Sequence, residues 1–355
     1  GGGSAAGEPL ESGTYQRAGA VPGEGEGDGY MTLSLIAAAV SFVLTLLIGR
    51  FLIPELRKLK AGQEIREDGP TWHKSKAGTP TMGGLSFIAA AFVAACLFVG
   101  EPDGTFIVTL CLALAYAAVG FLDDYLKIRR KDNLGLKPYQ KIIFQGAAAI
   151  LAGIYCYRSG AVVCRLPFCG KSVNFRGFIV PFAAFVFVAL VNAVNLTDGL
   201  DALAGGASAA YFFSFGVLIA LQSAAAGKAG AENSLALICF VLAASLCGFL
   251  LFNVFPASVF MGDTGSLALG GFAACVAVFS GNAFYAPVIG IMFVVSVITV
   301  VAQVIYYKAT KGKRIFLMAP VHHHFQKKGY SECKISFAYA VITAAAGLLS
   351  ILFAL

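Results

Sequence analysis

Charged side chains are scarce in this sequence of 355 residues. Lys, Arg, Asp and Glu make up 13% of it, apolar residues make up 58%, and the mean hydropathy is +0.78. Because soluble domains carry about 25% charged residues, the composition excludes a soluble globular protein and indicates an integral membrane protein. The net charge of +7 does not indicate a nucleic-acid partner, because the basic residues lie in loops between apolar runs, where the positive-inside rule places them.

The cysteine pattern lacks any CxxC spacing, so it offers no cysteine metal site. Several cysteines lie inside apolar runs and are interpreted as small hydrophobic residues: Cys96, Cys111, Cys239, Cys247 and Cys275. Cys164 and Cys169 share one polar loop and form a disulfide if that loop faces an oxidising space. The Gly and Arg spacing in this loop, 158–177, also suggests a short hairpin.

Residues 1–30 contain no apolar run and no periodicity, and they are rich in Gly, Ala and Glu. Such a composition cannot bury enough surface to fold. The opening Gly-Gly-Gly-Ser and the methionine at position 31 suggest a disordered, artificial leader ahead of the native start. We therefore expect residues 31–355 to form a single transmembrane domain.

From Met31 onward, apolar runs near membrane length alternate with polar loops. The expected fold is an all-α polytopic membrane protein with about ten spans, near 31–53, 83–100, 105–122, 142–157, 178–194, 202–223, 234–252, 266–281, 284–306 and 335–355. The loops 50–77, 123–141 and 307–334 hold 20 of the 26 Lys and Arg residues, which places these loops in the cytoplasm and both termini outside. Most of the remaining polar residues also lie in loops on the cytoplasmic side, so we expect a functional cleft at that face.

Two adjacent carboxylates, Asp123 and Asp124, close one apolar run. Acidic residues at the edge of a lipid-embedded helix are costly and are candidates for a functional site, although a solvated helix end also accumulates charge. Lys127 follows at helical spacing, close enough to hold a carboxylate or a bound anion. Lys137 and Lys141 in the same loop also satisfy the positive-inside rule without any catalytic role.

The other cytoplasmic loops each carry further polar residues. The segment 76–84 combines Gly and Pro before a predicted helix start, whose free N–H groups favour phosphate, although an ordinary loop-to-helix entry looks the same. The loop 195–201 holds Asp198 and Asp201, which share one face if the segment is helical. More amide and acid side chains surround them than a turn requires.

The last two loops suggest a cation and a phosphate contact. Asp263, between glycines, suits a hard cation such as Mg²⁺. Phe260 is either a stacking surface for a base or an anchor at the membrane interface. His322, His323 and His324 are consecutive, which gives poor convergence on zinc and favours phosphate contact or proton transfer.

Together these loops favour metal-assisted phosphoryl transfer between a soluble phosphate-bearing substrate and a lipid. A secondary transporter or channel would instead place charges near the span midpoints, which are nearly free of charge here, and an inert scaffold would not need polar loops gathered on one face.

Five motifs in order resemble the polyprenyl-phosphate N-acetylhexosamine-1-phosphate transferases, over essentially all of 31–355. They are Gly78-Thr79-Pro80-Thr81-Met82-Gly83-Gly84, Asp123-Asp124, Asn195-Leu196-Thr197-Asp198-Gly199-Leu200-Asp201, Phe260-Met261-Gly262-Asp263-Thr264-Gly265-Ser266 and Pro320-Val321-His322-His323-His324-Phe325. The histidine run favours the phospho-N-acetylmuramoyl-pentapeptide transferase branch over the alternative, a UDP-GlcNAc:polyprenyl-phosphate GlcNAc-1-phosphate transferase. Ala202 departs from the family pattern, in which Gly is expected.

The resemblance implies a Mg²⁺-dependent enzyme of peptidoglycan synthesis in the bacterial cytoplasmic membrane. Its substrates would be UDP-MurNAc-pentapeptide and undecaprenyl phosphate, and its products lipid I and UMP. The implied catalytic residues are Asp123, Asp124, Lys141, His323, His324 and Asp263, the last as the magnesium ligand. The implied uridine contacts are Lys76, Asp201 and Phe260, and the other implied substrate contacts are Thr81, Asn195, Asp198, Gly199, Leu200, Asn253, Gln303 and His322. Small residues in the spans make a homodimer the expected assembly.

Overall fold

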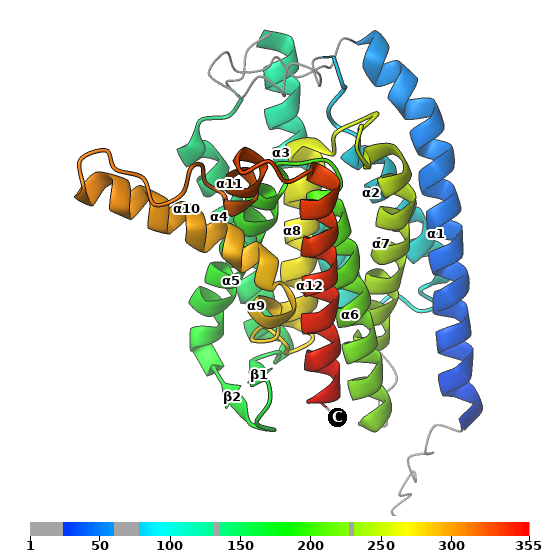
Figure 1. Ribbon diagram of the computed structural model, residues 1–355. Coiled ribbons are helices and arrows are strands. Elements are labelled where there is room, and N and C mark those ends of the chain that lie inside the picture. Colours follow the sequence, from blue (N-terminus) through cyan, green and yellow to red (C-terminus); the bar gives the residue numbers. More distant parts are fainter. Residues whose placement is uncertain (1–23, 60–77, 131–134, 227–230, 355) are drawn as a thin grey trace, which may run out of the picture.

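Each apolar run predicted as a span forms a helix in the computed structural model, which describes residues 24–59, 78–130, 135–226 and 231–354 (Figure 1). The helices are α1 Glu24–Lys58, α2 Gly84–Phe98, α3 Gly104–Arg130, α4 Pro138–Ser159, α5 Ile179–Thr197, α6 Leu203–Ala225, α7 Ala231–Asn253, α8 Gly262–Phe279, α9 Ala286–Ile289, α10 Ile291–Ala309, α11 Val321–Lys327 and α12 Glu332–Leu352. Two strands, β1 Val163–Arg165 and β2 Ser172–Asn174, and the 3-10 helix η2 Arg176–Phe178 complete the described elements.

In the described part of the chain, nine helices are long and apolar enough to cross a membrane. The remaining predicted span, 83–100, corresponds to α2, which is apolar but has only 15 residues. The predicted all-α polytopic fold is therefore confirmed. Helix α1 begins at Glu24, so its first turns lie within the stretch 1–30 that the sequence sets apart, and residues 1–23 lie outside the described residues.

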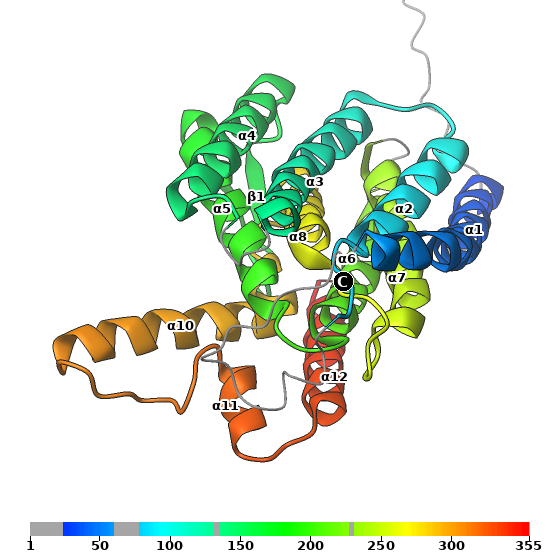
Figure 2. The same ribbon diagram turned by 90° about the horizontal axis from the view of Figure 1, so that it is seen from above.

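Helix α8 occupies the centre of the bundle, and α3, α5, α2 and α6 pack against it (Figure 2). Every residue from Thr264 to Phe279 is buried, and most of them are small or aliphatic. A helix that is apolar on all sides is stable only when other helices surround it. The central position of α8 therefore fixes its first turn, which carries Asp263, among the ends of the neighbouring helices.

The predicted span 284–306 is not one straight helix. It breaks at Gly290, whose φ of −83° and ψ of 32° end the short α9 and begin α10. Helix α10 then leaves the bundle obliquely (Figures 1 and 2). Large apolar side chains along it, Ile298, Val301 and Ile305, remain exposed on the isolated protein, as expected for a helix whose sides face lipid.

The predicted hairpin in 158–177 is present. Strands β1 and β2 pair antiparallel, with Val163 opposite Asn174 and Arg165 opposite Ser172. The Arg165 guanidinium donates to Gln222 Oε1 at 3.1 Å and to the Ser280 carbonyl at 3.0 Å, which fastens the hairpin to the ends of α6 and α8. Cys164 and Cys169 are both free thiols, one buried and one exposed, so the disulfide considered for this loop is not formed.

Candidate active site

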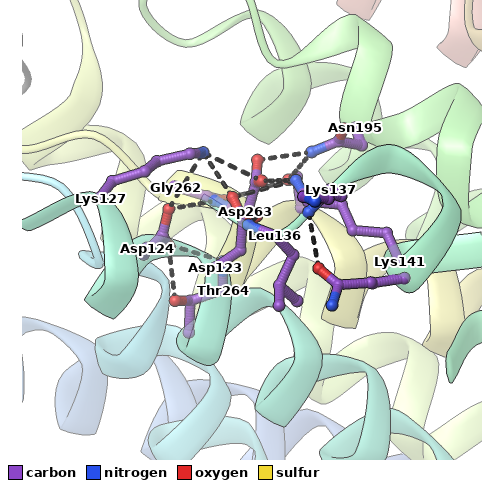
Figure 3. A network of polar contacts seen from close by, with 12 residues as sticks. Asp123, Asp124, Lys127, Leu136, Lys137, Lys141, Asn195, Gly262, Asp263 and Thr264 are labelled. Atoms are coloured by element: carbon purple, nitrogen blue, oxygen red, sulfur yellow. Dashed lines mark hydrogen bonds and ion pairs between the residues drawn. The ribbon is translucent and has the colours of Figure 1, made fainter. Parts of the chain in front are cut away.

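Three carboxylates meet where the end of α3 packs against the start of α8 (Figure 3). Asp123 and Asp124 come from the last turns of α3, and Asp263 comes from the first turn of α8. One oxygen from each carboxylate lies within 4.8 Å of the others. Among the described residues, this is the only group of three His, Cys, Asp or Glu side chains placed to hold a metal ion, so the consecutive histidines form no such group.

Two lysines lie directly against these acids. The Nζ atom of Lys127 is 2.6 Å from Asp123 Oδ2 and 3.2 Å from Asp263 Oδ2. The Nζ atom of Lys141, from the first turns of α4, is 3.0 Å and 2.5 Å from the same two oxygens. The helical spacing of Lys127 after Asp123, noted in the sequence, is confirmed. The two ammonium groups compensate carboxylates that would otherwise be buried as uncompensated charges.

Asp124 differs from its neighbour because it binds the N-terminus of α8. Its Oδ1 accepts the Asp263 N–H at 3.2 Å, and its Oδ2 accepts the Thr264 N–H at 2.9 Å and the Thr264 hydroxyl at 2.7 Å. The first N–H groups of a helix have no partner within the helix, so Asp124 acts as a cap supplied by another helix. Gly262 has a φ of 72°, and a side chain there would collide with the Asp124 carboxylate, so glycine is required at this position.

Asn195 connects this centre to α5. Its Nδ2 donates to Asp263 Oδ1 and to Ser266 Oγ, each at 2.9 Å. The sequence placed Asn195 and Asp263 in loops, whereas α5 continues to Thr197 and α8 begins at Gly262. Both side chains therefore project from helix ends, which hold them more rigidly than loops would.

The segment 78–84 pairs with the segment before α8. The Phe260 N–H donates to the Pro80 carbonyl at 2.8 Å, and the N–H groups of Gly83 and Gly84 donate to Phe260 and Met261 at 2.8 Å and 3.1 Å. The prediction of free N–H groups for phosphate at this helix start is therefore wrong, because the neighbouring segment uses them. Thr81 is buried here beside Gly262, and Phe260 is half-buried. Lys76 lies outside the described residues.

The segment from Asp198 to Ala202 is a turn, so Asp198 and Asp201 do not share a helical face as they would in a helix. Asp201, which is 2% exposed, accepts the Ala257 N–H at 3.0 Å. Asn253 accepts the Ala202 N–H at 3.0 Å and donates to the Val259 carbonyl at 2.9 Å. These bonds tie the turn to the loop between α7 and α8, and Leu200 is buried beneath it.

The three consecutive histidines point to different surroundings. His322 and His323 both lie over Gly199: a side chain there would collide with Nε2 of His322 and lie 3.1 Å from Nε2 of His323. His324 instead accepts the Leu317 N–H at Nδ1, at 3.1 Å, and its ring meets Phe316 edge-on. His322 and His323 therefore lie against the turn after α5, while His324 supports the segment between α10 and α11.

His322 is fully buried, and among the described residues neither of its ring nitrogens has a hydrogen-bond partner. Burial, together with the neighbouring His323, lowers the pKa of His322 to about 3. His322 is therefore neutral at neutral pH and cannot supply a positive charge to a phosphate. This makes it a poorer phosphate contact than its position in the motif suggests.

Gln303 supports the chain that leads to α11. Its Oε1 accepts the N–H groups of Ile315 and Phe316, and its Nε2 donates to the Phe316 carbonyl at 3.2 Å. All of its described polar contacts are with backbone. The predicted contact of Gln303 with the sugar or phosphate path stays a prediction.

Sequence reasoning did not include Lys127, Thr264 or Ser266 among the site residues. Lys127 had a local signal, its spacing from Asp123, whereas Thr264 and Ser266 gained their roles only when α3 and α5 packed on the start of α8. Chemically, the arrangement combines hard oxygen ligands with two ammonium groups at one end of a helix bundle. This combination can hold a divalent cation and neutralise phosphate groups.

Comparison with known proteins agrees with this chemistry. Residues 106–281, which run from α3 past the end of α8, match the family model of glycosyl transferase family 4. Residues 76–88 match signature 1 of phospho-N-acetylmuramoyl-pentapeptide-transferase. The fold, the site and these matches define the class: a multi-pass membrane enzyme that transfers a sugar phosphate.

Similar proteins of known type narrow the class to one family. The chain is 43% identical over 315 residues to the phospho-N-acetylmuramoyl-pentapeptide-transferase of Listeria welshimeri, covering 87% of this chain and 94% of the relative. It is also 43% identical over 309 residues to the enzyme of that name from Clostridium perfringens, covering 87% and 95%. The chain belongs to the phospho-N-acetylmuramoyl-pentapeptide-transferase family, as its motifs predicted.

Proposed function

We propose that this protein transfers the phospho-MurNAc-pentapeptide group from UDP-MurNAc-pentapeptide to undecaprenyl phosphate. An oxygen of the lipid phosphate forms a new bond to the sugar-bound phosphorus, the pyrophosphate bond of the nucleotide breaks, and UMP leaves. The products are lipid I and UMP. The observation that carries the proposal is the cluster of Asp123, Asp124 and Asp263 with Lys127 and Lys141, in a chain of this family.

Asp263 is the residue best placed to hold Mg²⁺. Magnesium binds oxygen ligands, commonly one or two carboxylates together with substrate phosphates. Asp263 fits because its side chain is 17% exposed, whereas Asp123 and Asp124 are almost completely buried beside it. When bound, the ion would neutralise the pyrophosphate.

Lys127 and Lys141 supply the mobile positive charges of the site. Both ammonium groups are bound to Asp123 and Asp263 in the structure, and both side chains remain about a quarter exposed. With a cation held by Asp263, these lysines would lose part of their attraction to that carboxylate and would be available to bind the lipid phosphate. Asp123, held by the Leu136 N–H at 2.7 Å, stays in place to orient that phosphate.

The remaining motif residues surround this centre and would contact the nucleotide sugar. Asn195 holds Asp263 in the required rotamer, and His323 faces the phosphate from the side of Gly199. Thr81, Asp198, Leu200 and Asn253 would contact the sugar and phosphates, and Phe260 and Asp201 are the proposed uridine contacts. Gln303 and His324 contribute indirectly, through the segment before α11.

The protein would act at the cytoplasmic face of the bacterial inner membrane. The described parts of the loops richest in Lys and Arg are the end of α1, the end of α3 and the segment from α10 to α12. They lie toward the same end of the bundle as the carboxylate cluster (Figure 1), and the positive-inside rule assigns such loops to the cytoplasm. UDP-linked substrates are made in the cytoplasm, which suits this orientation. The homodimer expected from the small residues of the spans stays a prediction.

The decisive experiment is UMP release by the detergent-purified protein supplied with UDP-MurNAc-pentapeptide, undecaprenyl phosphate and Mg²⁺. Parallel reactions contain UDP-GlcNAc, or EDTA in place of the metal. We expect release only with the pentapeptide nucleotide and only with metal. Release with UDP-GlcNAc would assign the chain to the alternative GlcNAc-1-phosphate reaction, and no release from folded protein would overturn the proposal.

Asp263→Ala is the variant that tests the centre directly. We expect UMP release to fall by about 10³-fold or more, because the cation loses its main carboxylate. The matched control is Glu55→Ala, which removes an exposed acid whose only described ion pair is with Lys58, and it should retain full activity. Activity near that of the unmodified protein in Asp263→Ala would remove Asp263 from the mechanism.

A further inference from the structure

A chain of hydrogen bonds links His323 to the start of α12. Nδ1 of His323 lies 3.2 Å from Oε1 of Gln326, and Nε2 of Gln326 donates to Oε1 of Glu332 at 3.1 Å. The other carboxylate oxygen of Glu332 accepts the Asp201 N–H at 3.2 Å. These hydrogen bonds therefore join α11, α12 and the turn after α5. Neither Gln326 nor Glu332 belongs to the motifs that indicated the family.

The direction of each bond follows from donor and acceptor chemistry. A carboxylate only accepts, so Glu332 requires the NH₂ group of Gln326. The amide oxygen of Gln326 must then face His323, and an oxygen can only accept from the ring. Nδ1 of His323 therefore carries the proton, which leaves Nε2 with the lone pair.

Nε2 is also the nitrogen that faces the turn after α5. It lies over Gly199, at 3.1 Å from the position that a side chain there would occupy. Helix α12 also binds Asp201 in the same turn through both of its backbone groups. Glu332 accepts the Asp201 N–H, and the Ser336 hydroxyl donates to the Asp201 carbonyl at 2.7 Å. Helix α12 thus fixes both the histidine ring and the surface that the ring faces.

His324 provides a contrast within the same motif. Its Nδ1 accepts the Leu317 N–H, so its proton resides on Nε2 when the ring is neutral. Two neighbouring histidines of one helix are therefore held in opposite tautomers by different partners. A neutral histidine in solution exchanges between both tautomers and favours the one with the proton on Nε2. The opposite tautomer at His323 therefore needs an acceptor beside Nδ1, and Oε1 of Gln326 is placed there.

We propose that Gln326 and Glu332 are positioning residues that hold His323 in the tautomer with the proton on Nδ1 and turn its Nε2 lone pair toward the transfer site. The catalytic part of this inference rests on the proposed function, in which His323 faces the transferring phosphate. In that role, Nε2 accepts a proton or a hydrogen bond during transfer. The orientation itself is a property of the protein without substrate.

The test begins with the tautomers, observed by long-range ¹⁵N–¹H NMR of the full protein labelled with ¹⁵N-histidine; His→Gln variants assign the signals. In the unmodified protein, His323 should show Nδ1–H and His324 should show Nε2–H. Gln326→Leu should abolish the fixed Nδ1–H state of His323 and leave His324 unchanged. Lys327→Leu, an exposed position on the same helix, is the matched control and should change neither signal.

Activity provides the second measurement. Gln326→Leu should lower kcat by about 10- to 100-fold with little change in KM. The groups that bind substrate remain, but His323 no longer keeps its proton on Nδ1 and its lone pair on Nε2. The double variant Gln326→Glu with Glu332→Gln reverses only the bond between positions 326 and 332. The carboxylate at 326 still accepts from Nδ1 of His323, and the amide oxygen at 332 still accepts the Asp201 N–H. This variant should restore the Nδ1–H signal and bring kcat back to within about threefold of the original, which a purely structural defect would not allow.

An unchanged His323 tautomer in Gln326→Leu, or a kcat equal to that of the Lys327→Leu control, would overturn the inference. If Gln326→Leu fails to fold, the double variant becomes the test. A His323 tautomer different from that of the unmodified protein would then refute the proposed role of Gln326 and Glu332. If the unmodified protein releases no UMP at all, the proposed function fails, while the NMR spectra still decide whether Gln326 and Glu332 orient the ring.

Discussion

Asp198 ends α5 in a position that disfavours its own ionisation. Its backbone N–H closes the helix by donating to the Val194 and Asn195 carbonyls. Burial raises the pKa of its carboxyl well above the ordinary value, and the nearby charges of Asp263, Asp124 and Asp201 raise it further. The folded state therefore favours the protonated form, and ionisation of Asp198 reduces the free energy of unfolding.

This predicts a stability gain in Asp198→Asn that depends on pH. Because the folded pKa is raised, the penalty is absent below the unfolded pKa of about 3.9 and grows as pH rises toward the folded pKa. Thermal unfolding in detergent should show a higher midpoint for Asp198→Asn at pH 8 than for the unmodified protein, with a smaller difference at pH 5. Glu55→Gln, at an exposed acid, should show no such trend. A gain of equal size at both pH values would contradict the explanation.

Single residues also show where sequence reasoning reached its limit. The spacing of Lys127 after Asp123 is local, so the ion pair could be predicted from the helical period. The partners of Gly83 and Gly84 lie beyond position 250, and no local pattern reveals them. Ala202 adopts a left-handed conformation with φ of 62°, which explains why glycine is expected there, since only glycine adopts it without strain.

At the scale of elements, the ends of helices rather than the loops between them build the site. The spans were predictable because an apolar run of membrane length has few alternatives to a helix. Their ends were less predictable: α5 extends three residues into the predicted loop and α8 begins four residues early. The break at Gly290 was also missed, because an apolar run has the same hydropathy whether its helix is straight or bent.

Because Asp124 caps α8, we expect the loss of its side chain to affect stability more than the loss of the Asp263 side chain. Asp124→Ala leaves the N–H groups of Asp263 and Thr264 buried without a partner, which should lower the free energy of unfolding by about 1–3 kcal/mol. Asp263→Ala leaves the cap intact and should cost much less. Chemical unfolding of both variants in EDTA measures the difference without any metal effect. Equal losses in the two variants would show that Asp124 is not a structural cap.

At the scale of the whole molecule, the carboxylate cluster lies at the opposite end of the bundle from the start of α1 and the end of α12 (Figure 1). Figure 1 shows the C-terminal end, the start of α1 and the β1–β2 hairpin at one end of the bundle, while α11 and the end of α3 lie toward the other. Two exposed cysteines mark these ends: Cys169 follows β1 in the hairpin, and Cys333 lies in the first turn of α12. They report the orientation of the protein in a membrane.

We expect a membrane-impermeant maleimide to label Cys169, but not Cys333, in intact spheroplasts. Inside-out vesicles should give the reverse, because the positive-inside rule places the hairpin outside and the site in the cytoplasm. Comparing the unmodified protein with Cys169→Ser and Cys333→Ser identifies the modified thiol. Loss of spheroplast labelling in Cys333→Ser would reverse the proposed topology.

The ammonium groups of Lys127 and Lys141 form ion pairs inside the carboxylate cluster. Two ammonium groups therefore offset most of the negative charge of the three acids before any ion arrives. Under the proposed mechanism the metal is needed for turnover but not for the integrity of the bundle. A cell short of magnesium would then keep an intact but silent population of this protein in its membrane. Cell-wall synthesis could resume as soon as the ion returned, without new protein being made or inserted.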